Sequence, residues 1–140
     1  MGKINLGRVL IGGVIAGIVY DILGYLVDGV LLAHRWADGM KALGHAEFTS
    51  NQIIEFNVLG LVFGIVLIWI YAAIRPCFGA GVKTAICAGL AVWVIGVLLP
   101  NLGFMWIPGL FSRHLTVFTT AGGLVEVVIA TIAGAAPYKE

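Results

Sequence analysis

The sequence predicts an all-α, polytopic membrane protein that folds as a single four-helix transmembrane bundle over residues 1–140. Of these 140 residues, 61% are hydrophobic and only 11% are charged, and the mean hydropathy is +1.06. A soluble domain carries about 25% charged residues, so the shortage of charge indicates that lipid is the solvent. No stretch alternates polar and apolar residues with a period of two, which favours helices over the strands of a membrane barrel.

Four apolar stretches are long enough to cross a membrane. A helix needs about 20 mostly apolar residues to cross a hydrocarbon layer about 30 Å thick. The stretches that meet this requirement are residues 6–32, 51–74, 83–105 and 115–136. The first has Lys3 and Arg8 at its start, as a signal peptide would. It is too long for one and contains Asp21 and Asp28, so we expect a retained helix.

Two features interrupt this pattern of straight spans. In the loop of residues 33–50, Trp36, Met40 and Leu43 recur at helical spacing, which predicts a short helix lying in the membrane interface. In the third span, Pro100 lacks the N–H that would bond to the carbonyl of Gly96, so we expect a kink at this position.

The basic residues predict which side of the membrane the termini occupy. Four spans place both termini on one side, together with the turn between the second and third spans. Loops rich in Lys and Arg stay in the cytoplasm, so we expect both termini there, in a multi-pass protein of a cytoplasmic membrane. The terminal side holds five basic residues and the other side three, namely Lys3, Arg8, Arg75, Lys83 and Lys139 against Arg35, Lys41 and Arg113.

The two halves of the chain share short matching segments. Residues 16–18 with Gly24 resemble residues 88–90 with Gly96, and residues 60–62 resemble residues 123–125. Either the chain is a duplicated helix pair, as many transporters are, or apolar helices match here by chance.

Small residues mark where the helices are expected to touch. Lipid gives helices no hydrophobic reason to associate, so close contact depends on residues that let two backbones approach. We assign this packing role to Gly13, Gly17 and Gly24 of the first span, Gly60 and Gly64 of the second, Gly89 and Gly96 of the third, and Gly123 of the fourth.

Three polar residues within the spans form the candidate functional site: Glu126, Asp21 and Asn101. A charge at the membrane centre costs about 2.5–3.5 kcal/mol on insertion scales, so such residues face the interior, pair, or bind protons. Glu126 follows His114 by 12 residues. That separation is about 18 Å along a helix and places Glu126 near mid-membrane. We expect a neutral carboxyl that either carries a proton or a cation, or only hydrogen-bonds a neighbouring helix.

Asp21 has two interpretations. It lies seven residues from Asp28, on nearly the same helix face, and Tyr25 follows it at hydrogen-bonding distance along the helix. It forms either a plain bond between helices or a shallow outer site together with Asn101, Arg113 or His114.

No motif predicts a catalytic, metal or cofactor site. His34, His45 and His114 map to the outer side, but no two have the i, i+4 spacing of a preorganised metal site. Cys77 and Cys87 are expected to be free thiols. The sequence leaves the identity of any cofactor unknown. The glycine-rich stretches lie within spans, where glycine marks helix packing and not a phosphate-binding loop.

The arrangement resembles small four-span bacterial membrane proteins of unknown function. The resemblance covers most of the chain and implies a bacterial cytoplasmic membrane but no activity. It rests on the glycine-rich first span, residues 71–76, residues 83–85, and residues 123–126.

Three functions are compatible with these features. The small size, the many helix-contact residues and the lack of a catalytic motif favour an accessory subunit packed against a larger membrane complex. The alternative is a small oligomeric transporter or channel, coupled to protons or cations, with Glu126 and Asp21 along its path. A membrane enzyme that uses the outer histidines is the least favoured. The expected partners are the lipid bilayer and other membrane subunits or further copies of the chain. A net charge of +1 offers no basic surface for nucleic acid.

Overall fold

The computed structural model describes residues 4–139, and this part of the chain is helical, without strands. Four helical stretches are long and apolar enough to cross a membrane: Leu6–Leu31, Ser50–Phe78, Val82–Met105 and Arg113–Ala135. The described chain is therefore helical and carries four candidate membrane spans, as the composition predicts.

The elements follow one another with short connections. Their order is α1 (Leu6–Gly24), η1 (Tyr25–Leu31), α2 (Ala33–Ala42), α3 (Ser50–Phe78), α4 (Val82–Trp93), η2 (Val94–Leu98), α5 (Leu99–Met105) and α6 (Arg113–Ala135). Side-chain oxygens of Asn5, Thr49 and Ser112 cap the starts of α1, α3 and α6, because each accepts a bond from a free backbone N–H of the first turn.

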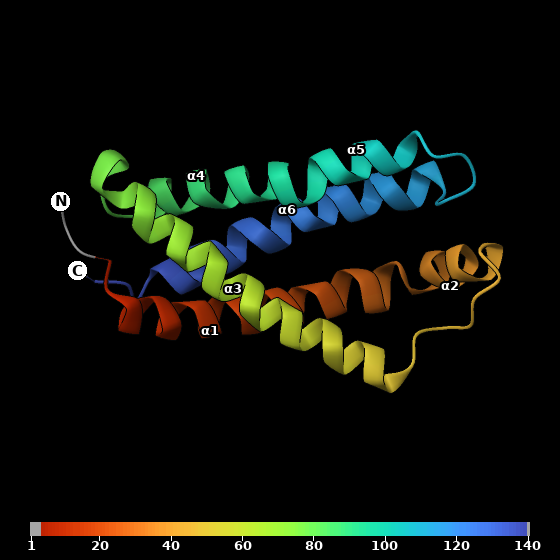
Figure 1. Ribbon diagram of the computed structural model, residues 1–140, viewed down its shortest axis with the longest axis horizontal. Coiled ribbons are helices and arrows are strands. Elements are labelled where there is room, and N and C mark those ends of the chain that lie inside the picture. Colours follow the sequence, from red (N-terminus) through yellow and green to blue (C-terminus); the bar gives the residue numbers. More distant parts are fainter. Residues whose placement is uncertain (1–3, 140) are drawn as a thin grey trace.

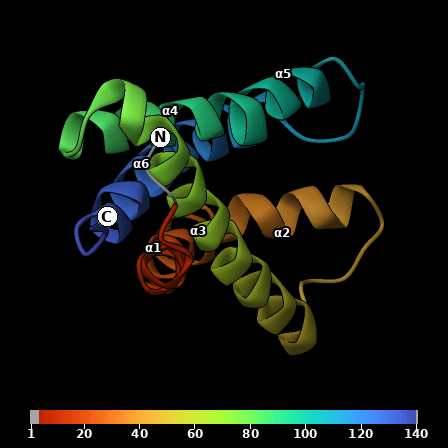
Figure 2. The same ribbon diagram turned by 60° about the vertical axis from the view of Figure 1, so that its left-hand side comes forward.

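The helices cross rather than run parallel. α1 packs on α3 and α6, and α4 packs on α6 from the other side. Figure 1 places both termini and the α3–α4 turn at one end, the terminal end, and α2 and the α5–α6 connection at the other, the loop end. Toward the loop end α3 leans away from the rest of the bundle, which both views show (Figures 1 and 2).

Glycines bring α1 into backbone contact with two neighbours. A Cβ atom added to Gly13 would lie 2.5 Å from Cα of Ile65, and one added to Gly17 would lie 2.6 Å from Cα of Leu61. On its other side, α1 meets α6 where Gly12 faces Gly134. Any side chain at these positions would force the helices apart, so the crossings depend on glycine.

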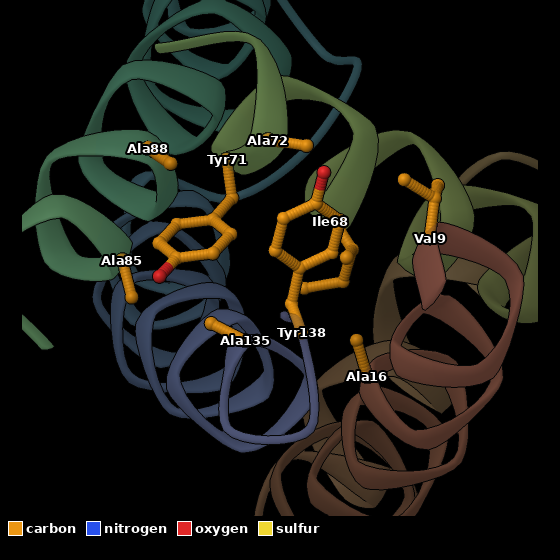
Figure 3. Close-up of a cluster of buried hydrophobic side chains, with 9 residues drawn as sticks. All are labelled: Val9, Ala16, Ile68, Tyr71, Ala72, Ala85, Ala88, Ala135 and Tyr138. Atoms are coloured by element: carbon orange, nitrogen blue, oxygen red, sulfur yellow. The ribbon is translucent and has the colours of Figure 1, made fainter. Parts of the chain in front are cut away.

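An aromatic pair fills the terminal end between α3, α4 and α6 (Figure 3). The rings of Tyr71 and Tyr138 meet edge to face, with centroids 5.8 Å apart. The Tyr71 hydroxyl accepts a bond from the backbone N–H of Gly81, and the Tyr138 hydroxyl accepts one from that of Asn5. Small buried side chains surround the rings, among them Ala72, Ala85, Ala88 and Ala135.

The two prolines in the spans are accommodated differently. The kink expected at Pro100 takes the form of the π-helical turn η2, which ends just before the proline and widens the helix where its hydrogen bond is missing. By contrast, α3 continues through Pro76 to Phe78, four residues beyond the predicted end of the second span. Pro76 lies in the last turn, so it disturbs little of the helix, and Gly79 with φ +81° then ends it.

Two sequence expectations stay predictions. Residues 33–42 do form a helix, α2, but its place in the membrane interface is untested. The proposed duplication of a helix pair is equally untested.

Candidate functional site

Glu126 projects from α6 toward α1. Its side chain is only 4% exposed, and its Oε2 lies 4.0 Å from the position that a Cβ atom of Gly24 would occupy. Its Oε1 lies 3.4 Å from the corresponding position at Gly122. Two glycines therefore leave the space that the carboxyl fills. Within residues 4–139, Oε1 is buried without a hydrogen-bond partner.

Tyr20 of α1 lies near the acidic residues of the site. It was not among the candidate residues predicted from the sequence. The acidic residues near it are Glu126, Asp28 and Asp21. Its ring packs against Phe63 of α3, with centroids 4.9 Å apart. Its position directly before Asp21 gave a local signal, but its proximity to Glu126 depends on how α1 and α6 cross.

Asp21 faces α3. Its carboxyl occupies the space beside Gly60 that a Cβ atom there would need, and the residue is partly exposed. Within the described chain it forms no hydrogen bond or ion pair, neither with Tyr25 nor with Glu126. Tyr25 is 68% exposed and begins the π-helical segment, where the turn is wider than the α-helical spacing assumed from sequence.

Asn101 belongs to a different contact from the one considered in the sequence. Its Nδ2 donates to Oγ1 of Thr120 on α6 at 2.8 Å. The backbone oxygen of Thr120 accepts a further bond from Nε1 of Trp93 at 2.9 Å. Thr120 thus ties the third span to α6. Within residues 4–139, Asp21 forms no hydrogen bond or ion pair with Asn101, Arg113 or His114, because its carboxyl faces Gly60 of α3 while Asn101 bonds to Thr120.

Asp28 links η1 to α2 through a hydrogen bond. It accepts a hydrogen bond from Nε1 of Trp36 at 3.0 Å. The Trp36 ring also meets Phe48 and Phe111 edge on, with centroids 6.1 and 5.8 Å apart. At the loop end, α2 is therefore held by this polar bond and a small aromatic group.

The remaining glycines assigned to packing have varied surroundings. A Cβ atom on Gly89 would lie 3.2 Å from Cα of Val128, so this glycine lies where α4 meets α6. One on Gly123 would lie 3.0 Å from Val97. Gly24 makes room for Glu126, and Gly96 has nothing within 4 Å, so no contact in the described structure depends on it.

The basic residues lie away from these carboxyls. Those in the described chain are at helix ends or outside the spans: Arg8, Arg35, Lys41, Arg75, Lys83, Arg113 and Lys139. Across residues 4–139, no group of three His, Cys, Asp or Glu residues lies close enough to hold a metal ion. The arrangement can thus hold a proton on Glu126 or direct a hydrogen bond from it, without a neighbouring positive charge. Comparison of the chain with protein-family models, curated proteins and solved structures gives no match.

Proposed function

We propose that this protein is an accessory subunit of a larger membrane complex and that the first ten residues of α3 form its partner-binding arm. Residues 50–59 are all exposed, and this part of α3 leans away from the bundle (Figure 2). Its large apolar side chains are exposed by half or more: Ile53, Ile54, Phe56, Val58 and Leu59. Apart from the contact of the Phe56 ring with Phe48, with centroids 5.6 Å apart, these exposed side chains are free to pack against another protein.

Asn57 supports a protein rather than lipid as the neighbour of this arm. It lies seven residues into α3, about 10 Å along the helix. Its Nδ2 donates to the backbone oxygen of Ile53, while its side-chain oxygen accepts no bond within the described chain. Amides in membranes bond across helix interfaces, so a partner helix would satisfy this oxygen.

The test is site-specific photo-cross-linking in native membranes. A cross-linker at Val58, on the arm, should give one adduct with a larger membrane protein. The matched control is a cross-linker at Val14, which is also exposed but lies on α1 in the bundle. It should give no such adduct, and Asn57→Leu should weaken the adduct formed from Val58. Adducts only between copies of this chain would overturn the accessory role.

A buried carboxyl supports a second candidate function, a proton- or cation-coupled transporter formed by an oligomer. Glu126 is buried in mid-span, and Oε1 lacks a partner within residues 4–139. The test is ion flux into liposomes that contain the purified protein. Glu126→Gln should abolish flux, while Glu55→Gln, at an exposed position, should not. Flux that persists in Glu126→Gln would exclude this role.

We further propose that the protein lies in a bacterial cytoplasmic membrane with both termini in the cytoplasm. More basic residues lie at the terminal end, which supports this orientation. The exposed thiol of Cys77 lies in the last turn of α3, at the same end. In intact cells, a membrane-impermeant maleimide should leave Cys77 unlabelled. The same reagent should label an Ala46→Cys variant in the outer loop, and the reverse result would invert the orientation.

A further inference from the structure

A groove runs along the outside of the bundle between η1 and α6. Its volume is about 400 Å³. The walls are apolar: Val27 and Leu31 come from η1, and Ala121 and Val125 from α6. Gly122 forms part of the floor, because a Cβ atom there would lie 2.6 Å from Cγ1 of Val27. A side chain at Gly122 would therefore push the two walls apart.

The groove runs in the direction of a lipid chain and covers about two thirds of the depth of one leaflet. From Phe118 at its outer end to Val125, it covers seven residues of α6. That is about 10 Å along the helix, against about 15 Å for half of the hydrocarbon layer. It begins near α2 at the loop end and runs toward the membrane centre, parallel to α6.

The outer mouth of the groove carries a positive charge. The guanidinium carbon of Arg35 lies 4.5 Å from the centre of the Phe118 ring, and both residues line the groove. Stacking on the ring fixes the face of the guanidinium and leaves its N–H edges free to donate. Within residues 4–139, Arg35 forms no ion pair with an acidic side chain. Its charge therefore remains available to an anion at the membrane surface.

We propose that this groove binds an anionic phospholipid, with an acyl chain along η1 and α6 and the phosphate on Arg35. The two features match the two parts of such a lipid. The apolar walls exclude a polar ligand, while a guanidinium binds phosphate oxygens in pairs. Basic positions beside transmembrane helices bind lipid phosphates in the same way. The proposal does not depend on which side of the membrane the loop end faces, nor on the accessory role.

The test measures lipid binding to the full-length protein in a neutral detergent by native mass spectrometry. Phosphatidylglycerol should bind at least about tenfold more tightly than phosphatidylcholine, a difference of about 1.4 kcal/mol. Arg35→Gln should remove this preference, and Arg113→Gln, at an exposed arginine outside the groove, should retain it. Ala121→Phe should weaken the binding of both lipids, because it fills the groove.

Each result decides the proposal. Both groove substitutions lie at exposed positions, so the variants should keep the wild-type helix content by circular dichroism. Retained preference in Arg35→Gln would overturn the role of Arg35. Unchanged lipid binding in Ala121→Phe would overturn the groove. Equal displacement of phosphatidylglycerol by inorganic phosphate would show a site for free anions instead of a lipid.

Discussion

The terminal end and the loop end of this protein are built on different principles. At the terminal end, backbones touch through Gly12, Gly13 and Gly134, and the Tyr71–Tyr138 pair fills the remaining space. At the loop end, α3 departs from the bundle (Figure 1). Polar bonds join helices there, from Trp36 to Asp28 and from Asn101 to Thr120. Both π-helical segments, η1 and η2, also lie in the loop-end halves of their spans.

This difference assigns separate tasks to the two ends. Close backbone contact maximises dispersion attraction, the main source of stability where lipid removes the hydrophobic drive. The loop end leaves side chains available, including the arm of α3 and the groove beside η1. Glu126 lies at the boundary, beside Gly24, where α1 passes into η1. The terminal end therefore supplies stability, and we expect binding at the loop end.

The strongest test of this difference is a matched pair of glycine substitutions. Gly13→Leu should lower the free energy of unfolding by about 3 kcal/mol or more, because the new side chain would collide with the backbone of α3. Gly96→Leu should change it by less than about 0.5 kcal/mol, because nothing lies within 4 Å of that Cβ position. Reversible unfolding in mixed micelles measures both. Equal losses would show that the terminal end is not the more tightly packed region.

An intermediate effect is expected from the aromatic pair. Tyr138→Ala should cost about 2 kcal/mol, less than the 3–5 kcal/mol typical of a large aromatic in a soluble core. In lipid the substitution removes packing contacts and the bond from Asn5 N–H, without the loss of hydrophobic burial that adds to the cost in water. The control is Trp106→Ala at the loop end, where the side chain is 84% exposed and little should change. The same unfolding assay applies. A larger loss from Trp106→Ala would reverse the comparison.

The smallest effect is expected from the polar bonds of the loop end. Asn101→Leu should cost about 0.6 kcal/mol, the average for a hydrogen bond between membrane helices. A double-mutant cycle with Thr120→Val isolates the energy of the bond between Asn101 and Thr120. A coupling energy above about 2 kcal/mol would mean that the loop end also depends on specific bonds for stability.

The helical fold follows from local features of the sequence, but the site does not. Composition and four long apolar stretches predicted an all-helical membrane protein, because any chain with such segments must satisfy its backbone groups inside lipid. The Pro100 interruption was also local and visible. The segment η1 contains no proline, so no local signal in the sequence indicated it. The end of α3 at Phe78 was also not predicted, because it depended on the position of Pro76 within the last turn.

Among the candidate residues, sequence identified Glu126 and Asp21 but not their neighbours. A carboxyl in an apolar span is recognisable by itself, because its cost in lipid is independent of the fold. Its contacts with other helices are not, since Tyr20 and Gly24 adjoin Glu126 only through the packing of α1 against α6. Gly122 lies four residues before Glu126 on the same helix, so this neighbour alone follows from helical spacing. For the same reason Asn101 was grouped with Asp21, whereas the structure joins it to Thr120.

The sequence by itself determined the solvent of this protein, the number of its spans and the residues that are costly in lipid. These properties depend on hydropathy summed along the chain, so no knowledge of neighbours is needed. Only the tertiary structure decided which glycines touch, that the two ends differ in packing, and that Arg35 stands above a groove. These depend on the crossing angles of the helices, which arise from side chains far apart in the sequence.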